Sequence, residues 1–216
     1  MKASIIIILL ICNWTMTVAM KKAPEMMEIP AGKFIMGPNA ANHRESPNSV
    51  DLPPFHIDRF ETSNSEYKRI IPSHRYPKGA DLHPVTGINW KEAQNYCKRI
   101  GKRLPSSAEW EKAARGVDGR IYPWGDKAPK RKAHPYFSGL VKRKTGHNKK
   151  DRSPYGVRDM AGSVWEWTSD HHADGKAVTR GGLWNFHLDY EYSKTYEFSM
   201  AEIDKKFPFL GFRCAR

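Results

Sequence analysis

Apolar residues recur at helical spacing in two neighbouring segments near the middle of the chain. After Asn89 the apolar positions lie three or four residues apart, and the run stops at Gly101, which is typical of a helix with one buried face. The second segment begins at Ser106, which is followed three residues later by Glu109, the pattern of a capping box. Its apolar face ends at Gly116. The pattern therefore predicts two helices, one after Asn89 and one after Ser106.

Shorter apolar runs precede these helices. Residues 27–37 contain two such runs around a Pro-Ala-Gly sequence, which predicts a hairpin. Residues 50–60 alternate in part between apolar and polar positions and predict a strand that breaks at Pro53 and Pro54. A short helix is expected over residues 64–71. The first half of the chain thus mixes short strands with two or three helices.

The N-terminus has the features of a secretory signal peptide. Lys2 precedes an unbroken apolar run over residues 5–12 that is too short to span a bilayer, and small residues allow cleavage after Ala19. We expect a signal peptide over residues 1–19, a domain over residues 20–216, and export to the periplasm or the exterior. An uncleaved N-terminal anchor is the alternative.

Composition narrows the class of protein. The chain has 216 residues, of which 39% are hydrophobic and 27% are charged, as in a folded domain rather than a disordered chain. Its three cysteines, Cys12, Cys97 and Cys214, are too few for a four-cysteine zinc or iron–sulfur site. Removal of the signal peptide would leave two, which can pair in an oxidising compartment.

The positive charge is concentrated in one segment without regular periodicity. The formal net charge is +13, and residues 127–152 contain ten Lys and Arg residues but a single acid, Asp151. Such density suits phosphate groups, yet few aromatic residues are interleaved and export would remove most nucleic acid from reach. We expect a solvated loop, or one that contacts an anionic surface or glycan, and no nucleic-acid partner.

Six segments resemble, in order, the sequence motifs of one family. They are residues 29–37 (IPAGKFIMG), 103–116 (RLPSSAEWEKAARG), 122–125 (YPWG), 155–167 (YGVRDMAGSVWEW), 180–184 (RGGLW) and 211–214 (GFRC). All six are similar to the sulfatase-modifying-factor family, whose founding activity is formylglycine generation. The resemblance implies a single α+β domain, a C-type-lectin-like variant with much irregular structure.

The resemblance also implies structural roles for particular residues. It implies a disulfide between Cys97 and Cys214, the alternative being two separate buried thiols. It further implies a structural calcium ion, which prefers oxygen ligands. The implied ligands are the side chains of Asp159 and Glu166 and the carbonyl groups of Gly162 and Val164.

The implied calcium site has one alternative interpretation and differs from the family sequence at some positions. In the alternative interpretation, Glu166 forms an ion pair with one of the many basic residues and does not bind calcium. Ser163 stands where the family usually has Asn, although this position is not an implied ligand. A second family calcium site would fall near residues 134–151, where His134, Pro135 and Tyr136 do not offer the expected ligand.

The copper site of formylglycine-generating members has no counterpart in the sequence. Those members bind copper(I) through two cysteines after the RGGS segment, since soft thiolates suit that ion. The equivalent positions here are Phe186 and Glu191, and neither is a thiol. The sequence therefore disfavours ordinary formylglycine generation and a copper cofactor. A nitrogen and oxygen site for iron or another divalent ion is a weaker alternative, in which His187 and Glu191 are the candidate residues, with His171, His172, Asp189 and Tyr192 nearby.

Two functions follow from these observations. The first is an exported accessory or binding protein, non-catalytic or divergent, whose partner is an exported protein, a peptide or an anionic glycan. The alternative is an oxidoreductase of the same family that modifies an exported protein or peptide through a metal site without cysteines. The sequence leaves open whether the protein is an enzyme.

Overall fold

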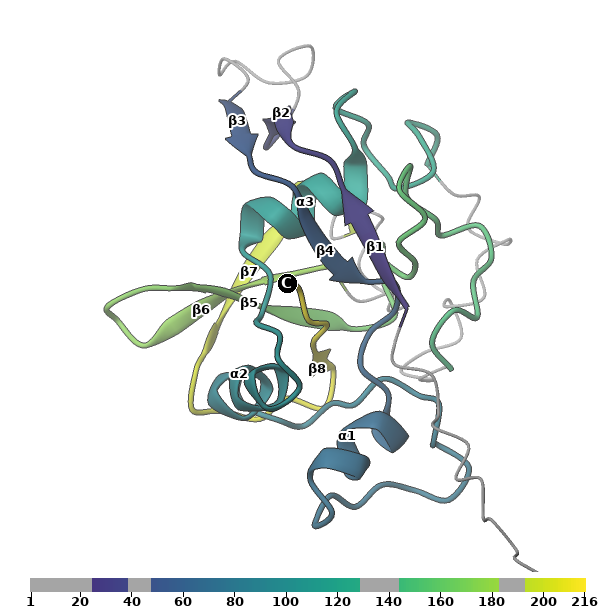
Figure 1. The fold of residues 1–216 in the computed structure, drawn as a ribbon, viewed down its shortest axis with the longest axis vertical. Coiled ribbons are helices and arrows are strands. Elements are labelled where there is room, and N and C mark those ends of the chain that lie inside the picture. The colour runs from purple at the N-terminus through teal and green to yellow at the C-terminus, as the bar shows by residue number, and fades with distance from the viewer. Residues whose placement is uncertain (1–24, 39–47, 129–143, 183–192) are drawn as a thin grey trace, which may run out of the picture.

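The computed structural model describes residues 25–38, 48–128, 144–182 and 193–216 (Figure 1). These residues form short strands, three helices and long irregular connections. In chain order the elements are β1 (Met26–Ile29), β2 (Gly32–Met36), β3 (Asn48–Leu52), β4 (Phe55–Asp58), α1 (Asn64–Ile70), α2 (Trp90–Arg99), α3 (Ser107–Arg115), β5 (Trp165–His171), β6 (Lys176–Arg180), β7 (Phe198–Glu202) and β8 (Leu210–Gly211). None of the described helices combines the length and the apolarity needed to cross a membrane.

The first four strands form one kinked ribbon. β1 pairs with β4 and β2 pairs with β3, both antiparallel and in one continuous register, in which Ile29 faces Phe55 and Gly32 faces Leu52. The predicted hairpin between the two runs of residues 27–37 is therefore wrong, because these runs follow one another along one arm of the ribbon. Three prolines interrupt the ladder at the kink, since proline has no amide hydrogen to donate. They are Pro30, Pro53 and Pro54.

A second sheet carries the later part of the chain. Its strand order is β7-β6-β5-β8, with β5 and β8 parallel and the other neighbours antiparallel. Trp167 on β5 and Leu210 on β8 pack with α2 residues in one hydrophobic core. A second core lies between the N-terminal ribbon and α3 and includes Ile57, Trp110 and Met160. The ribbon and the sheet thus lie on either side of buried aromatic side chains.

All three predicted helices are confirmed, and each begins with a capping box. The N-cap residues Ser63, Asn89 and Ser106 each accept a hydrogen bond from the amide of a glutamate three residues later, whose side chain bonds back to the cap. α2 buries one face, as its apolar spacing predicts. α3 differs, because Glu111 and Arg115 on it are also fully buried. Its local sequence does not reveal that charged side chains enter the core.

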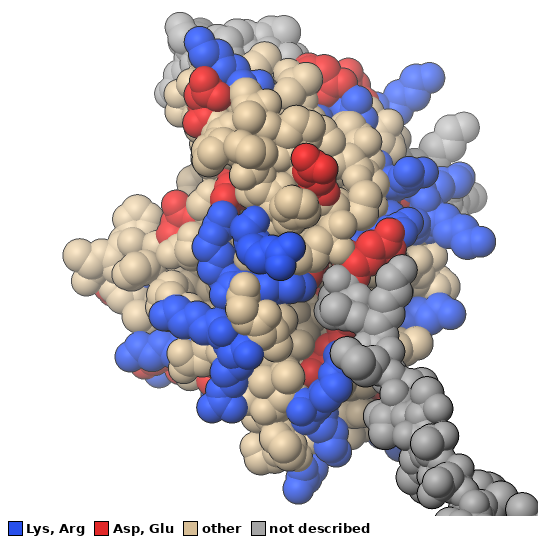
Figure 2. Space-filling view, in the orientation of Figure 1, with Lys and Arg blue, Asp and Glu red and all other residues tan. Residues whose placement is uncertain are grey.

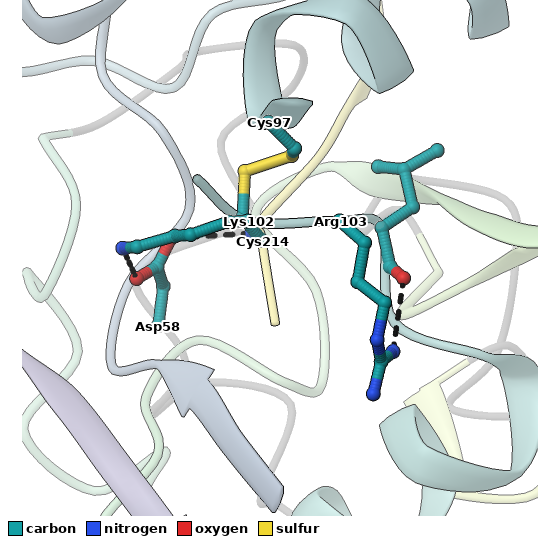
Figure 3. Close-up of a disulfide and its surroundings, with 6 residues drawn as sticks. Asp58, Cys97, Lys102, Arg103 and Cys214 are labelled. Carbon is teal, nitrogen blue, oxygen red and sulfur yellow. Dashed lines mark hydrogen bonds and ion pairs between the residues drawn. A yellow bond between two sulfur atoms is a disulfide. The ribbon is translucent and has the colours of Figure 1, made fainter. Parts of the chain in front are cut away.

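A disulfide joins α2 to the C-terminal segment. Cys97 and Cys214 are 117 residues apart in sequence, and their Cα atoms are 5.7 Å apart. Figure 3 shows the bridge beside Asp58, which forms an ion pair with Lys102 and accepts a hydrogen bond of 3.2 Å from the amide of Cys214. Burial raises the pKa of Asp58, and the charge of Lys102 opposes this shift. The bridge therefore joins α2 to the segment after β8, and the amide of Cys214 links that segment to Asp58 at the end of β4.

Removal of this disulfide should destabilise the protein strongly. Because the bridge closes a loop of more than a hundred residues, the loss of chain entropy in the unfolded state corresponds to about 5 kcal/mol. We expect a Cys97→Ala/Cys214→Ala variant to unfold at a much lower denaturant concentration than the parent protein. Chemical denaturation followed by circular dichroism checks this, with the reduced parent protein as the control. An unchanged midpoint would contradict the prediction.

Candidate functional site

The loop from Asp159 to Glu166 is buried against both cores and has an unusual backbone. Asp159 and Ser163 have φ angles of 59° and 77°, the only positive values among the described residues other than glycine. Asp and Asn adopt this left-handed region more readily than most residues. This preference gives a physical reason why Asn is the usual residue at the position of Ser163. The loop is thus held in one conformation by its surroundings rather than by local preference.

Glu166, at the start of β5, forms the most buried ion pair of the site. Its oxygens accept hydrogen bonds of 2.7 Å from Nε and from Nη2 of Arg213, and Oε2 also accepts one of 2.9 Å from the indole of Trp110. Glu166, Arg213 and Trp110 are each 0% exposed. The alternative interpretation of Glu166, an ion pair with a basic residue, is therefore what the structure contains.

Arg213 uses all five of its N–H groups. Besides Glu166, it donates to the carbonyl oxygens of Asp58, Arg59 and Arg158 at 3.0–3.2 Å. Burial lowers the pKa of Arg213, but the charge and hydrogen bonds of Glu166 outweigh it and raise the pKa above its ordinary value. This role of Arg213 was not expected from the sequence. The available signal was an arginine directly between Phe212 and Cys214.

Two further carboxylates of the site lack full hydrogen bonding. Oδ2 of Asp159 accepts a hydrogen bond from the amide of Gly146, whereas Oδ1 is buried without a partner in the described part of the chain. Glu61, which is 1% exposed, accepts no hydrogen bond of ordinary geometry at either oxygen among the described residues. Burial and then the charge of Asp159 raise the pKa of Glu61, although the side chain of Ser163 interacts with it and opposes this rise. Sequence reasoning missed Glu61, because nothing in its local pattern marks it as buried.

The connection that contacts Asp159 requires a glycine. Gly146 has a φ angle of +73°, and a Cβ atom there would lie 2.6 Å from Cε1 of Phe60. A side chain at this position would displace either Phe60 or the amide that binds Asp159.

Asp151 supports the loop from its other side. Its two oxygens accept hydrogen bonds from the amides of Met160 and Ala161, at 3.2 and 3.0 Å. Burial, followed by the charge of Asp159, raises the pKa of Asp151 to about 7. The loop is thus surrounded by acidic groups that are costly to ionise together.

The described donor groups fit the calcium ion implied by the resemblance only in part. Asp159 fits, because it has a free buried oxygen. Glu166 fits less well, because Arg213 and Trp110 already bind its carboxylate. Among the residues that the structure describes, no group of three or more His, Cys, Asp or Glu side chains is arranged to hold a metal ion. Any cation here would depend on fewer carboxylates and on backbone carbonyl groups.

Only two of the residues considered for an oxidative metal site, His171 and His172, lie in the described part of the chain. His171 and His172 are exposed at the end of β5, and the ring of His171 lies 5.0 Å from that of Trp90. Phe186, His187 and Glu191 lie outside the described residues, as does the first part of the second calcium region, including His134 and Tyr136.

A basic groove lies beside α1. It has a volume of about 420 Å³, and its lining includes His74, Arg75, Tyr76, Lys78 and His83. Figure 2 shows many Lys and Arg side chains on the face that carries α1 and α2. Burial and the charge of a nearby lysine lower the pKa of His74. The sequence concentrates positive charge in residues 127–152, and its local pattern does not reveal this groove.

Replacement of Arg213 by methionine should unfold much of the protein population. The change leaves Glu166 as an uncompensated buried charge, which typically costs about 3–5 kcal/mol. A matched control is Lys206→Met, which removes an ion pair with Glu92 whose side chains are 51% and 37% exposed. That change should cost only about 0–1 kcal/mol. Thermal unfolding measures both, and equal shifts in the two variants would contradict the importance of burial.

Comparison with known proteins identifies relatives of the whole chain. The model of the sulfatase-modifying factor enzyme 1-like domain matches residues 14–216. The formylglycine-generating enzyme of Mus musculus is 28% identical over 88% of this chain and 74% of its own length. The inactive C-alpha-formylglycine-generating enzyme 2 of the same organism is 27% identical over 74% of each chain.

Solved structures share the fold. Treponema denticola variable protein 1 has a TM-score of 0.71 at 20% identity and covers 88% of this chain and 94% of its own. PvdO from Pseudomonas aeruginosa has a TM-score of 0.68 at 22% identity, with 89% and 94% covered. The α+β fold with much irregular structure is thus that of formylglycine-generating-enzyme-type, C-type-lectin-like domains. The chain belongs to the sulfatase-modifying-factor family, which includes both formylglycine-generating enzymes and inactive relatives.

Proposed function

We propose that this chain is an exported member of the family that lacks the oxidative chemistry and acts as an accessory or binding protein. The observation that carries the proposal is the disulfide between Cys97 and Cys214. It uses both cysteines that would remain after signal-peptide removal, so no thiol is left for copper(I). The positions of the family's copper ligands hold Phe186 and Glu191 instead.

The scaffold is retained although the thiols are absent. Arg213, Glu166 and Trp110 form a fully hydrogen-bonded buried cluster, and the three helix caps are intact. Burial of charged groups is unfavourable unless the fold pairs them, so their presence indicates that the function depends on the folded domain. The similarity to an inactive relative supports a role in which the fold serves binding rather than oxidation.

The partner in this proposal is anionic. The groove beside α1 offers Arg75, Lys78 and two histidines, while Tyr76 supplies a ring on which a sugar could pack. One carboxylate lies close, because the hydroxyl of Tyr76 donates a hydrogen bond of 3.1 Å to Asp81. The charge of this groove favours a sulfated or carboxylated glycan over a neutral one.

The proposal includes a structural calcium ion at the Asp159–Glu166 loop. Its support is the free buried oxygen of Asp159 and the excess of buried carboxylates around it. Calcium would stabilise the loop by neutralising this charge. Copper has no place in the proposal.

A turnover assay tests the absence of oxidative chemistry. The purified protein, offered copper(I) and a cysteine-containing peptide, should bind less than one copper per chain and consume no oxygen above background. The mouse formylglycine-generating enzyme is the positive control. Stoichiometric copper or iron together with turnover would instead support the alternative function, an oxidoreductase with a metal site that lacks cysteines.

A binding assay tests the anionic partner. Lys78 is exposed in the groove, so Lys78→Glu should weaken binding of a sulfated oligosaccharide by roughly tenfold, since it replaces an attraction by a repulsion. Lys205→Glu is the control, because it makes the same change of charge at an exposed position outside the groove. Equal weakening in both variants would mean that the groove is not the site.

A further inference from the structure

β7 is an edge strand with an exposed outer side in the described part of the chain. In the sheet order β7-β6-β5-β8 it pairs only with β6. Its first three residues, Phe198, Ser199 and Met200, are all exposed. An edge of this kind presents a row of backbone donors and acceptors to any strand that can lie beside it.

The register of β7 on β6 shows which of its backbone groups face outward. Just beyond the ladder, the amide of Ile203 donates a hydrogen bond of 3.0 Å to the carbonyl oxygen of Gly175. Antiparallel strands exchange hydrogen bonds at alternate residues, so every second residue before Ile203 bonds to β6. The amide and carbonyl groups of Phe198 and Met200 therefore point away from β6. Neither residue forms a backbone hydrogen bond outside the sheet with another described residue.

The side chains at these outward positions are large and apolar. Phe198 is 56% exposed and Met200 is 39% exposed. They lie on the same face of β7, because successive residues of a strand point to opposite faces. Ala201 lies on the other face and packs against the hydrophobic core beside α2. β7 thus contributes one face to the core and exposes an apolar pair on the other.

β7 has none of the common features that prevent strand addition. Proline, lysine or a bulge usually protects the edge strand of a sheet. Residues 198–202 contain neither proline nor lysine, and their register with β6 is uninterrupted. Their one charged residue, Glu202, lies at the end of the strand. The central backbone groups of β7 are therefore accessible for pairing.

The charge of this region favours a second copy of the same chain as the partner. The formal net charge of the chain is +13, which opposes contact between two copies over most of the surface. Residues 193–206 are an exception, because their three lysines balance their three acidic residues. These are Lys194, Lys205 and Lys206, and Glu197, Glu202 and Asp204. Two copies that meet at β7 repel one another less than at a basic surface.

One antiparallel register of two β7 strands is self-complementary. A two-fold axis at Ser199 places Phe198 of each copy opposite Met200 of the other, so that outward backbone groups meet and exchange hydrogen bonds. Contacts between a thioether and an aromatic ring are favourable. An axis at Met200 would instead place Phe198 opposite Glu202. The first register therefore keeps the carboxylate outside the apolar contact.

We propose that the protein forms a homodimer in which the β7 strands of two copies pair antiparallel about Ser199. The two four-stranded sheets then form one continuous sheet. Because a single strand pair is a small interface, the expected dissociation constant lies in the micromolar range, roughly 1–100 µM. This inference goes beyond the proposed function and depends on neither the anionic partner nor the calcium ion.

Sedimentation equilibrium of the purified protein tests the self-association. The parent protein should associate reversibly between about 1 and 500 µM. Met200→Lys should raise the dimer dissociation constant by roughly tenfold or more, because the symmetric contact loses two apolar side chains and gains two charges. Val117→Lys is the matched control. Val117 is 59% exposed and follows α3, so the same type of change there should leave the dissociation constant unchanged.

A cysteine cross-link tests the register. Facing residues at a position without backbone hydrogen bonds have Cα atoms about 4.5 Å apart, which a disulfide can bridge. Ser199 is exposed and would face its own counterpart at the axis, so Ser199→Cys should give a covalent dimer on a non-reducing gel. Val117→Cys controls for chance collisions, since it places a thiol at an exposed position outside β7.

Three results would overturn the proposal. They are a monomeric parent protein over this concentration range, equal weakening by the two lysine variants, and no more cross-linking of Ser199→Cys than of Val117→Cys. A monomer that binds an extended apolar peptide through β7 would also overturn it, because the edge would then belong to a different partner. Thermal unfolding shows whether Met200→Lys is folded, and if it is not, the cross-link at position 199 decides.

Discussion

The guanidinium group of Arg213 connects three separate parts of the chain, because each of its five N–H groups binds a different carbonyl oxygen or a different atom of Glu166. Its partners lie at the end of β4, before the Asp159–Glu166 loop and on β5. Trp110 brings α3 to the same carboxylate. Neighbours of this ion pair belong to both cores, Trp167 and Phe212 to one and Trp110 and Ala215 to the other. A buried pair of this kind fixes geometry more surely than it adds stability, since its desolvation offsets much of its attraction.

A second buried network around Glu111 follows the same principle. Glu111 accepts hydrogen bonds from the amide of Gly37 and from Arg115, and forms an ion pair of 3.0 Å with Arg180. Arg115 in turn donates to the carbonyl oxygen of Ile35, among others. α3 therefore binds the end of the N-terminal ribbon through charged groups, whereas α2 packs through apolar ones. Much irregular backbone is held in place because its carbonyl groups have these buried cations as donors.

Local patterns in the sequence were sufficient for features that depend on neighbouring residues. The helix after Asn89, the capping box at Ser106 and the break at Pro53 follow from spacing and from the chemistry of a single turn. The pairing of the N-terminal strands was not predictable in this way, since the register depends on residues 12 to 32 positions apart. For a related reason the sequence did not predict that three charged residues, Arg213, Glu61 and Glu111, are buried. Only tertiary contacts decide whether a charged residue is buried, and charged residues usually lie at exposed positions.

The disulfide has a consequence for the order in which the molecule can be built. β8 and the residues after it pair with segments that emerge much earlier, since Ala215 exchanges hydrogen bonds with Arg103 and Arg216 with His56. During synthesis Cys97 becomes available 117 residues before Cys214, which at ordinary rates of translation is roughly 6–23 s. In that interval its thiol has no native partner, and α2 lacks the strand that completes its core. Premature oxidation of Cys97 with a thiol of another molecule would therefore compete with folding, and cells that produce this protein need a way to reverse such bonds.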